Sequence, residues 1–174
     1  MNILVLNCGS SSIKFQLLNM AEEKMMAEGI MEKIGEDVSL YTYKSEPYTK
    51  KKREIVIEDH AKGLQMIIDT LLDPNHGVIK NANEIDAVGH RLVHGGEYFS
   101  GSVKITKEVE EVLEKCCALA PLHNPANIRG IEAAHKNLPN TIQCGCFDTA
   151  FHQTIPAKAF LYPIPLKLYN DHKV

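Results

Sequence analysis

Apolar residues recur at every second position in the first part of the chain, which is the spacing typical of β-strands. Residues 2–6 are aliphatic, residues 7–12 are small and polar, and apolar residues resume at strand spacing over 13–18. This pattern predicts a β-hairpin with a turn at its centre. Residues 38–44 and 51–58 alternate in the same way and are predicted strands.

The segment 23–33 is ambiguous, because its apolar residues fit either a third strand or a short helix. Beyond residue 60 the apolar period lengthens to that of an amphipathic helix, and Pro74, Thr106 and the pair Asn124-Pro125 mark helix ends. Short apolar stretches separate these helical segments. The predicted elements of this part are helices over 60–72, 106–119 and 125–136, and strands over 85–93 and 141–147.

Strands come first and then alternate with helices, which predicts an α/β or α+β fold with a mixed sheet covered by helices. The length of 174 residues suits one domain. The tail, residues 156–174, contains three prolines and shows no clear periodicity. It is nevertheless rich in apolar residues, so we expect it to pack against a further part of the protein.

Composition excludes several classes of protein. The chain has 19 Lys+Arg and 22 Asp+Glu, a net charge of −3, whereas a general nucleic-acid binder has a strong basic excess. The aliphatic stretch at residues 3–6 is too short for a signal peptide or a membrane span. The five cysteines are an odd number, so we expect reduced and mostly buried thiols. These features predict a cytoplasmic protein with neither a nucleic-acid nor a membrane partner.

The turn of the first hairpin is the most informative segment. It reads Asn7-Cys8-Gly9-Ser10-Ser11-Ser12-Ile13-Lys14, with small residues, three hydroxyls and a following lysine. Free backbone N–H groups in such a turn are able to bind phosphate oxygens. An ordinary Gly-Ser hairpin turn explains the residues equally well, and the run lacks the full Walker A pattern.

A second motif is Gly89-His90-Arg91-Leu92-Val93-His94-Gly95-Gly96-Glu97. It leads from a buried strand into a Gly-Gly turn, and α/β proteins bind ligands at such strand ends. Arg91 is able to bind a carboxylate or a phosphate with two hydrogen bonds. Alternatively, Arg91 is structural and paired with a nearby carboxylate such as Glu97.

Two shorter motifs add candidates. In Ala120-Pro121-Leu122-His123-Asn124-Pro125, the loop residue His123 is able to donate to an anion, or simply to the backbone. In Phe147-Asp148-Thr149-Ala150-Phe151-His152, Asp148 directly follows a predicted strand. That position suits a metal-associated carboxylate in phosphoryl transfer. The alternative for Asp148 is a helix N-cap.

Together, these four motifs resemble the acetate kinase family, in the same order and over the whole chain from Met1 to about Val174. Propionate kinases share much of the pattern. The resemblance implies a ribonuclease H-like domain of the actin, sugar kinase and heat-shock ATPase type, with a mixed sheet flanked by helices. It also implies transfer of phosphate between ATP and a short carboxylate such as acetate, with Mg²⁺.

By this resemblance, the catalytic residues are Asp148 and Arg91, and Arg91 also binds the substrate. Val93 and Leu122 would line the pocket for the substrate methyl group, with His123 nearby. The expected ATP- and phosphate-binding residues are Lys14, Ser10 and Ser12. The expected metal-linked residues are Asn7 and, as a possibility, Asp148.

Acetate kinases continue into a Phe-His-Gly-type segment and a second domain of related fold, which this sequence does not contain. We therefore expect residues 1–150 to form the N-terminal domain and residues 151–174 to lead toward the second domain. The chain alone is expected to be inactive, and a homodimer is conceivable for the full-length protein. The alternatives are a propionate kinase and a non-catalytic domain that binds carboxylate or phosphate.

Overall fold

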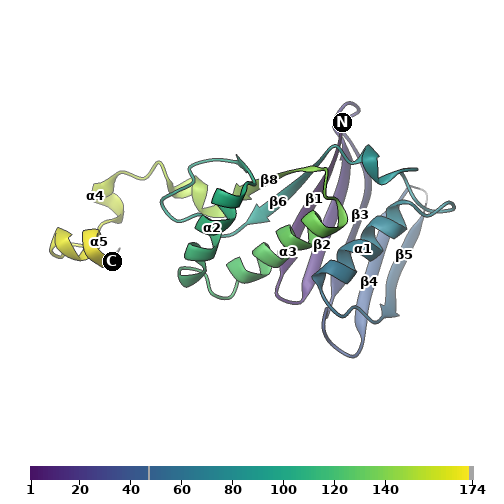
Figure 1. The fold of residues 1–174 in the computed structure, drawn as a ribbon, viewed down its shortest axis with the longest axis horizontal. Helices are drawn as coiled ribbons and strands as arrows, with labels where there is room; N and C mark the ends of the chain where they lie inside the picture. Colours follow the sequence, from purple (N-terminus) through teal and green to yellow (C-terminus); the bar gives the residue numbers. More distant parts are fainter. Residues whose placement is uncertain (47, 173–174) are drawn as a thin grey trace.

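The computed structural model describes residues 1–46 and 48–172. Within this part of the chain, eight strands form one mixed sheet in the order β5-β4-β3-β2-β1-β6-β8-β7 (Figure 1). The strands are β1 (Asn2–Gly9), β2 (Ser12–Asn19), β3 (Lys24–Glu32), β4 (Ser39–Ser45), β5 (Thr49–Ile55), β6 (Ala87–Leu92), β7 (Val103–Lys104) and β8 (Ile142–Phe147). The helices are α1 (His60–Leu71), α2 (Lys107–Lys115), α3 (Asn124–Asn137), α4 (Ala157–Phe160) and α5 (Leu166–His172). Short 3₁₀ turns occur at η1 (Ala82–Glu84), η2 (Cys116–Ala118) and η3 (Asp148–His152).

The sheet has two parts with different strand directions. Strands β1 to β5 form an antiparallel meander, which confirms the predicted first hairpin and resolves residues 23–33 as strand β3. Strands β1, β6 and β8 run parallel, so their carboxyl ends meet at one edge. Strand β7 pairs antiparallel with β8 and was not predicted from the sequence, because two residues carry no readable alternation.

Helices α1, α2 and α3 lie together against one face of the sheet (Figure 1). All three were predicted, and two have side-chain caps: Asp59 accepts from the backbone N–H of Lys62 (2.7 Å), and Thr106 from that of Val109 (3.4 Å). The core lies between these helices and the sheet, and it includes Leu4, Leu6 and Ile67, each at most 1% exposed.

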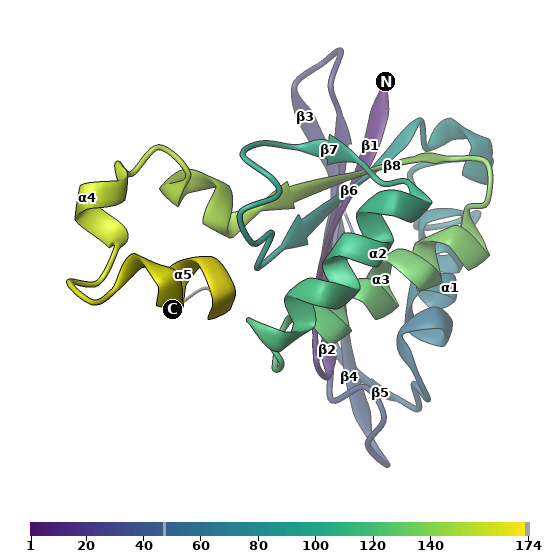
Figure 2. The same ribbon diagram turned by 60° about the vertical axis from the view of Figure 1, so that its left-hand side comes forward.

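The opposite face of the sheet carries no helix from the described part of the chain (Figures 1 and 2). Since successive strand residues point to opposite faces, Leu4 and Leu6 face the helices, while Val5 and Asn7 face away. One face of these strands is therefore covered by helices, and the other is open to solvent in the described part of the chain.

The tail forms two short helices, α4 and α5, which extend away from the sheet (Figure 2). Neither helix was predicted, because helices of four and seven residues are too short to show a clear helical period. The apolar side chains Phe160, Tyr162 and Leu166 are 48%, 69% and 58% exposed. The Tyr169 hydroxyl donates to the carboxylate of Glu97 and so ties the tail to the turn that follows β6.

The structure shows the state of the cysteines and bears on the prediction of buried thiols. All five cysteines are free, but Cys146 is exposed and two more are only partly buried, so the prediction of mostly buried thiols was wrong. In the part of the chain that the structure describes, no helix has the length and apolar character needed to cross a membrane.

Candidate active site

The carboxyl ends of the parallel strands bring the predicted site residues together on the helix-free face. Lys14 of β2 pairs with Asn7 of β1, and the parallel β1–β6 ladder brings Asn7 level with Arg91. Arg91 in turn pairs with Cys146 of β8. Strands β2, β1, β6 and β8 thus each place one of these residues in a row across the sheet. Asp148 follows directly after the end of β8.

Arg91 and Asp148 form a bidentate ion pair at this edge. Arg91 Nε donates to Asp148 Oδ1 (3.1 Å), and Arg91 Nη2 donates to Asp148 Oδ2 (2.7 Å). Arg91 Nη1 also donates to Asn7 Oδ1 (3.3 Å). The hydrogen bonds that Arg91 donates to Asp148 raise the pKa of Arg91, so the guanidinium stays charged. The two side chains are 52% and 41% exposed, so the pair is accessible from solvent.

The structure identifies the carboxylate that pairs with Arg91 and excludes one alternative for Asp148. Arg91 pairs with Asp148, whereas Glu97 accepts from Tyr169. Asp148 is not a helix cap either, since Phe147 occupies the N-cap position of η3 and makes no side-chain capping bond. The Asp148 carboxylate is instead directed at Arg91, which the residue types alone could not reveal.

The first hairpin turn is a tight turn at Ser10-Ser11, closed by the pairing of Gly9 with Ser12. Its carbonyls are held from behind: His60 Nε2 donates to the Gly9 carbonyl (2.7 Å), and the Ile34 N–H donates to the Ser11 carbonyl (3.0 Å). Burial lowers the pKa of His60, which favours the neutral form of the ring. Ser10 is exposed and Ser12 is partly exposed. Phosphate binding here stays a prediction.

Asn124 and Asn127 at the start of α3 hold the backbone that follows β6. Asn127 Oδ1 accepts from the Val93 N–H (3.0 Å), and its Nδ2 donates to the Cys8 carbonyl (2.9 Å). Asn124 accepts from the His94 N–H (3.2 Å) and donates to the His94 carbonyl (2.9 Å). Both asparagines are almost fully buried. They join the first turn, the Gly-Gly turn and α3 into one rigid unit.

Thr149 completes this clamp from the η3 side, where its hydroxyl accepts from the Gly95 N–H (3.0 Å). Gly96 has a φ of 59°, in the left-handed region that favours glycine. None of the three clamping residues was identified as such from the sequence. The only sequence evidence for them is that Asn124 and Asn127 are polar residues at the start of a predicted helix and that Thr149 directly follows Asp148.

The predicted substrate-pocket residues occupy the rim of the same edge. Val93 is half-buried at the end of β6, Leu122 is 78% exposed, and His123 is exposed at the residue before α3. Asn124 links the loop of Leu122 and His123 to the backbone at His94. Val93 thus lies two residues after Arg91, Asn124 links the loop of His123 to His94, and Leu122 is left uncovered.

Lys14 and Asn7 line a hollow on the helix-free face, with a volume of about 480 Å³. The hollow continues over β3 and β4, where Glu28 and Lys44 form an ion pair (3.2 Å). Lys14 is exposed, so its ammonium group is able to bind an anion near the carboxyl end of β1.

The donor atoms at this edge fit a magnesium ion. Mg²⁺ prefers oxygen ligands and usually takes one or two carboxylates together with water and substrate phosphates. Asn7 supplies an amide oxygen and Asp148 a carboxylate, both within reach of Arg91. Among the described residues there is no cluster of three or more His, Cys, Asp or Glu side chains that could hold a metal without a substrate.

An α/β domain with this strand order, helices packed on the sheet and charged side chains at the strand ends has the ribonuclease H-like fold of actin, sugar kinases and heat-shock ATPases. Within that class, the chain belongs to the Acetokinase family, which it matches over residues 2–174.

Relatives of known name agree with this assignment. The chain is 51% identical over its full length to an acetate kinase of Caldanaerobacter subterraneus and covers 43% of that protein. It is 52% identical to an acetate kinase of Agathobacter rectalis and covers 44% of it. The chain thus spans less than half the length of these curated relatives, and it corresponds to their N-terminal part.

Solved structures give the same result. The crystal structure of Porphyromonas gingivalis acetate kinase superposes with a TM-score of 0.92 at 47% identity, over 99% of this chain and 43% of that one. A propionate kinase from Francisella tularensis superposes with a TM-score of 0.88 at 40% identity, with the same coverage.

Proposed function

We propose that this chain is the N-terminal part of an ATP:acetate phosphotransferase, which converts acetate and ATP to acetyl phosphate and ADP reversibly. The observation that carries the proposal is the cluster of Arg91, Asp148 and Asn7 at the carboxyl ends of three parallel strands. Its chemistry suits an anionic acceptor and a transferred phosphoryl group. The proposal for the whole reaction includes the part of the protein beyond this chain.

Arg91 is proposed to hold the substrate carboxylate. A guanidinium has five N–H donors, and three of them are directed at Asp148 and Asn7. These bonds leave one N–H on each terminal nitrogen, a pair able to bind a carboxylate in bidentate fashion. Asp148 and Asn7 fix the orientation of that edge before the substrate arrives.

The acceptor needs no general base. A carboxylic acid has a pKa of roughly 4 to 5, so acetate is already ionised at neutral pH. We therefore propose that Asp148 acts by orienting Arg91 and by holding Mg²⁺ together with Asn7. When bound there, Mg²⁺ would neutralise charge on the transferring phosphate.

The nucleotide side of the proposal involves the first hairpin. Ser10 and Ser12 would offer hydroxyl and backbone donors to phosphate oxygens, and Lys14 would add a positive charge. His60 and Ile34 support the turn by binding its carbonyls. The turn is thereby held in place from the covered side of the sheet.

Acetate and propionate differ by one methylene group, which is worth about 1 to 3 kcal/mol in an apolar pocket. Val93 and Leu122 are the proposed wall for the substrate methyl, and the similarity to a propionate kinase keeps propionate as the second candidate. Because Leu122 is 78% exposed, its pocket would be completed by the rest of the protein.

We further propose that residues 1–150 form the N-terminal domain and that residues 151–174 lead toward a second domain. The exposed apolar side chains of the tail and the helix-free face of the sheet support this division. The full-length enzyme is proposed to work in the cytoplasm and to form a homodimer. The 174-residue chain alone should show no turnover in a coupled ADP-release assay.

Arg91 provides the test of the proposed reaction in the full-length protein. Arg91→Ala should lower kcat/KM for acetate by at least about 100-fold, because a charge-assisted bidentate contact is lost. Arg91→Lys should recover little, since an ammonium cannot reproduce the planar fork. Lys80→Ala, an exposed position before η1, is the matched control and should leave the rate unchanged. Near-normal kinetics in both Arg91 variants would overturn the assignment.

Asp148→Asn separates the proposed metal role from an acid–base role. Loss of the charge should weaken the apparent affinity for Mg²⁺ and lower kcat. If Asp148 were an obligatory base, the metal dependence would stay normal and the pH–rate profile would lose its acidic limb. Rates measured against Mg²⁺ concentration at several pH values distinguish the two results.

A further inference from the structure

A chain of four side chains runs from the surface of α2 to the interior beneath β6. His90 Nε2 lies 2.7 Å from Gln143 Oε1, Gln143 Nε2 lies 2.8 Å from His135 Nδ1, and His135 Nε2 lies 3.0 Å from Glu110 Oε1. His90 and Gln143 are 3% and 2% exposed, whereas His135 and Glu110 are accessible to solvent. The chain thus connects a solvent-accessible histidine to a buried one.

The carboxylate of Glu110 sets the direction of these hydrogen bonds while His135 is neutral. A carboxylate only accepts, so it selects the His135 tautomer with its proton on Nε2. His135 Nδ1 then accepts from the Gln143 amide, and the Gln143 carbonyl accepts from His90 Nε2–H. Every donor along the chain therefore points outward, toward Glu110. Burial lowers the pKa of His90 to about 4, so its ring stays neutral near pH 7.

A second proton on His135 reverses this order. Protonated His135 carries hydrogen on both ring nitrogens, so its Nδ1 needs an acceptor in place of the Gln143 amide group. A half-turn of the Gln143 amide presents the carbonyl to His135 and the NH₂ group to His90. His90 Nε2 must then accept, so His90 loses the proton on Nε2 to water and binds another from water at Nδ1, an exchange that requires transient exposure of the buried ring.

We propose that Glu110, His135, Gln143 and His90 form a reversible hydrogen-bond relay that holds strands β6 and β8 together in both protonation states of His135. Gln143 is the reversing element, because its amide offers a donor on one side and an acceptor on the other. No proton travels through the relay. The directions of its hydrogen bonds reverse, and His90 changes tautomer.

The relay lies behind the proposed active site. His90 and Gln143 tie β6 to β8 on the helix-covered face, and Arg91 and Asp148 tie the same two strands on the opposite face. Through these strands, the relay positions the residues of the ion pair; this role rests on the proposed function, whereas the reversal does not. Gln143 and His90 are thus positioning residues that touch no substrate.

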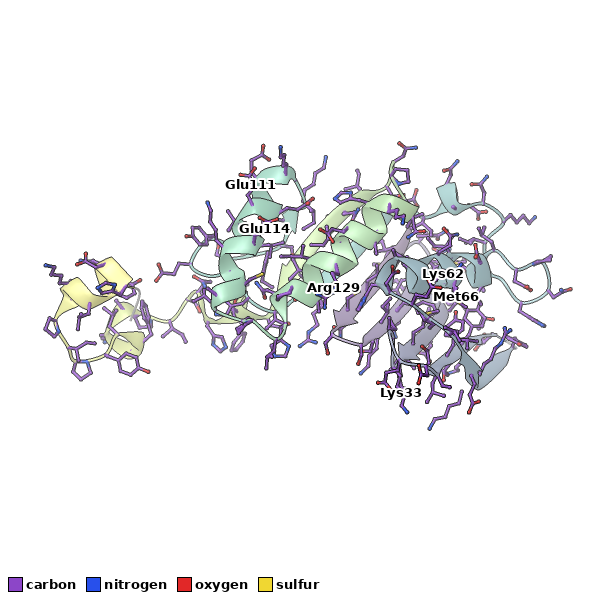
Figure 3. The ribbon with its side chains drawn as sticks, turned by 60° about the horizontal axis from the view of Figure 1, so that its bottom comes forward. Lys33, Lys62, Met66, Glu111, Glu114 and Arg129 are labelled. Atoms are coloured by element: carbon purple, nitrogen blue, oxygen red, sulfur yellow. The ribbon has the colours of Figure 1, made fainter. Side chains whose placement is uncertain are left out.

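The charged groups around His135 are few. Glu110 faces it from α2, His90 lies beyond Gln143 in the sheet, and Glu132 and Lys136 are its nearest charged neighbours along α3. Other charged residues of the helices, such as Glu111 of α2 and Lys62 of α1, are shown in Figure 3 and are exposed. Glu111 therefore serves as a matched control for Glu110.

The experiment follows the tautomers by NMR of the ¹⁵N-labelled 174-residue chain between roughly pH 5 and pH 8, where histidine ordinarily titrates. Long-range ¹H–¹⁵N correlations identify which nitrogen of each ring carries hydrogen. We expect His90 to move its hydrogen from Nε2 to Nδ1 with the same midpoint as the protonation of His135. Glu111→Gln should behave like the wild type. A His90 ring that keeps its tautomer while His135 titrates would overturn the relay.

Two variants test the links. Gln143→Leu should uncouple His90 from pH and weaken the Arg91 Nε–H signal, because the tie behind the ion pair is lost. Glu110→Gln should remove the preference for the outward direction and give both His90 tautomers at high pH; as a surface change, it remains informative if Gln143→Leu does not fold. An unchanged Arg91 signal in folded Gln143→Leu would overturn the positioning role. None of these readouts requires catalysis, so they stand apart from the test of the proposed function.

Discussion

The two faces of the sheet are built from the same strands but serve different purposes. On β1, Leu4 and Leu6 are buried beneath the helices, and the residues between and after them, Val5 and Asn7, line the open hollow. On β6, His90 faces the covered side and Arg91 the open side. The residues that form the core lie on one face, and those of the proposed chemistry lie on the other. Along each strand, neighbouring residues belong to opposite faces.

This difference explains why charged residues are tolerated so close to the core. A buried charge is costly, but the alternation of the strand directs Arg91 and Asp148 outward to a solvent-accessible edge. The covered face keeps its polar groups neutral and hydrogen-bonded, as His90 and Gln143 show. The following experiments compare the two faces directly.

The largest contrast is expected in thiol reactivity. Cys8 is buried on the covered face, and burial raises its pKa to about 12, whereas Cys146 is exposed on the open face. Since the thiolate is the reactive form, Cys146 should react with iodoacetamide at least about a thousandfold faster than Cys8. Peptide mapping by mass spectrometry after timed alkylation measures both sites in one sample. Comparable rates at the two cysteines would contradict the burial seen in the structure.

Core packing provides the next contrast. Leu6→Ala should lower the free energy of unfolding by about 2 to 5 kcal/mol, because it opens a cavity at a residue that is 1% exposed. Val5→Ala, at the neighbouring position on the open face, should cost under about 1 kcal/mol. Urea unfolding of both variants of the 174-residue chain provides the comparison. Equal losses would mean that the open face is as tightly packed as the covered one.

Acid should destabilise the covered face through His90. Its pKa is about 4 in the folded protein and about 6.5 when unfolded, so below pH 6.5 the unfolded state binds the proton first. The free energy of unfolding should therefore fall by about 3 kcal/mol between pH 7 and pH 4 because of this residue. His90→Gln removes the titrating group, and its stability should depend less steeply on pH over that range. Parallel slopes for the two proteins would contradict the neutral buried ring.

The smallest effect on stability is expected at Arg91. The ion pair with Asp148 is about half exposed, and exposed pairs contribute about 1 kcal/mol or less. Arg91→Ala should therefore shift the unfolding midpoint only slightly in the 174-residue chain, although it should abolish most activity in the full-length protein. A large loss of stability would identify Arg91 as mainly structural.

Much of the fold could be predicted from the sequence because its elements have strong local patterns. Residues 2–19 alternate cleanly, and α1 to α3 have caps or proline at their starts. Strand β7 and the helices of the tail could not be predicted, since their short lengths carry no period and their position depends on distant partners.

The candidate site was predictable in its residue types but not in its pairings. Arg91 and Asp148 were identified separately at strand ends, and their separation by 57 positions gave no sign of the ion pair. Asn124 and Asn127 were overlooked because asparagine at the start of a helix suggests only a cap. Their clamping role depends on tertiary contacts with β1 and the turn after β6.

The strand order has a consequence for how the chain acquires its shape during synthesis. Strand β8 lies between β6 and β7 although it follows both in the sequence, so β6 lacks its neighbour on that side, and β7 has no place in the sheet, until β8 has formed. Until residue 147 has left the ribosome, β6 presents an open edge, and open edges recruit other strands. The nascent protein is thus most prone to aggregate just before β8 emerges, and a pause in translation at that point would be more harmful than one a few residues later.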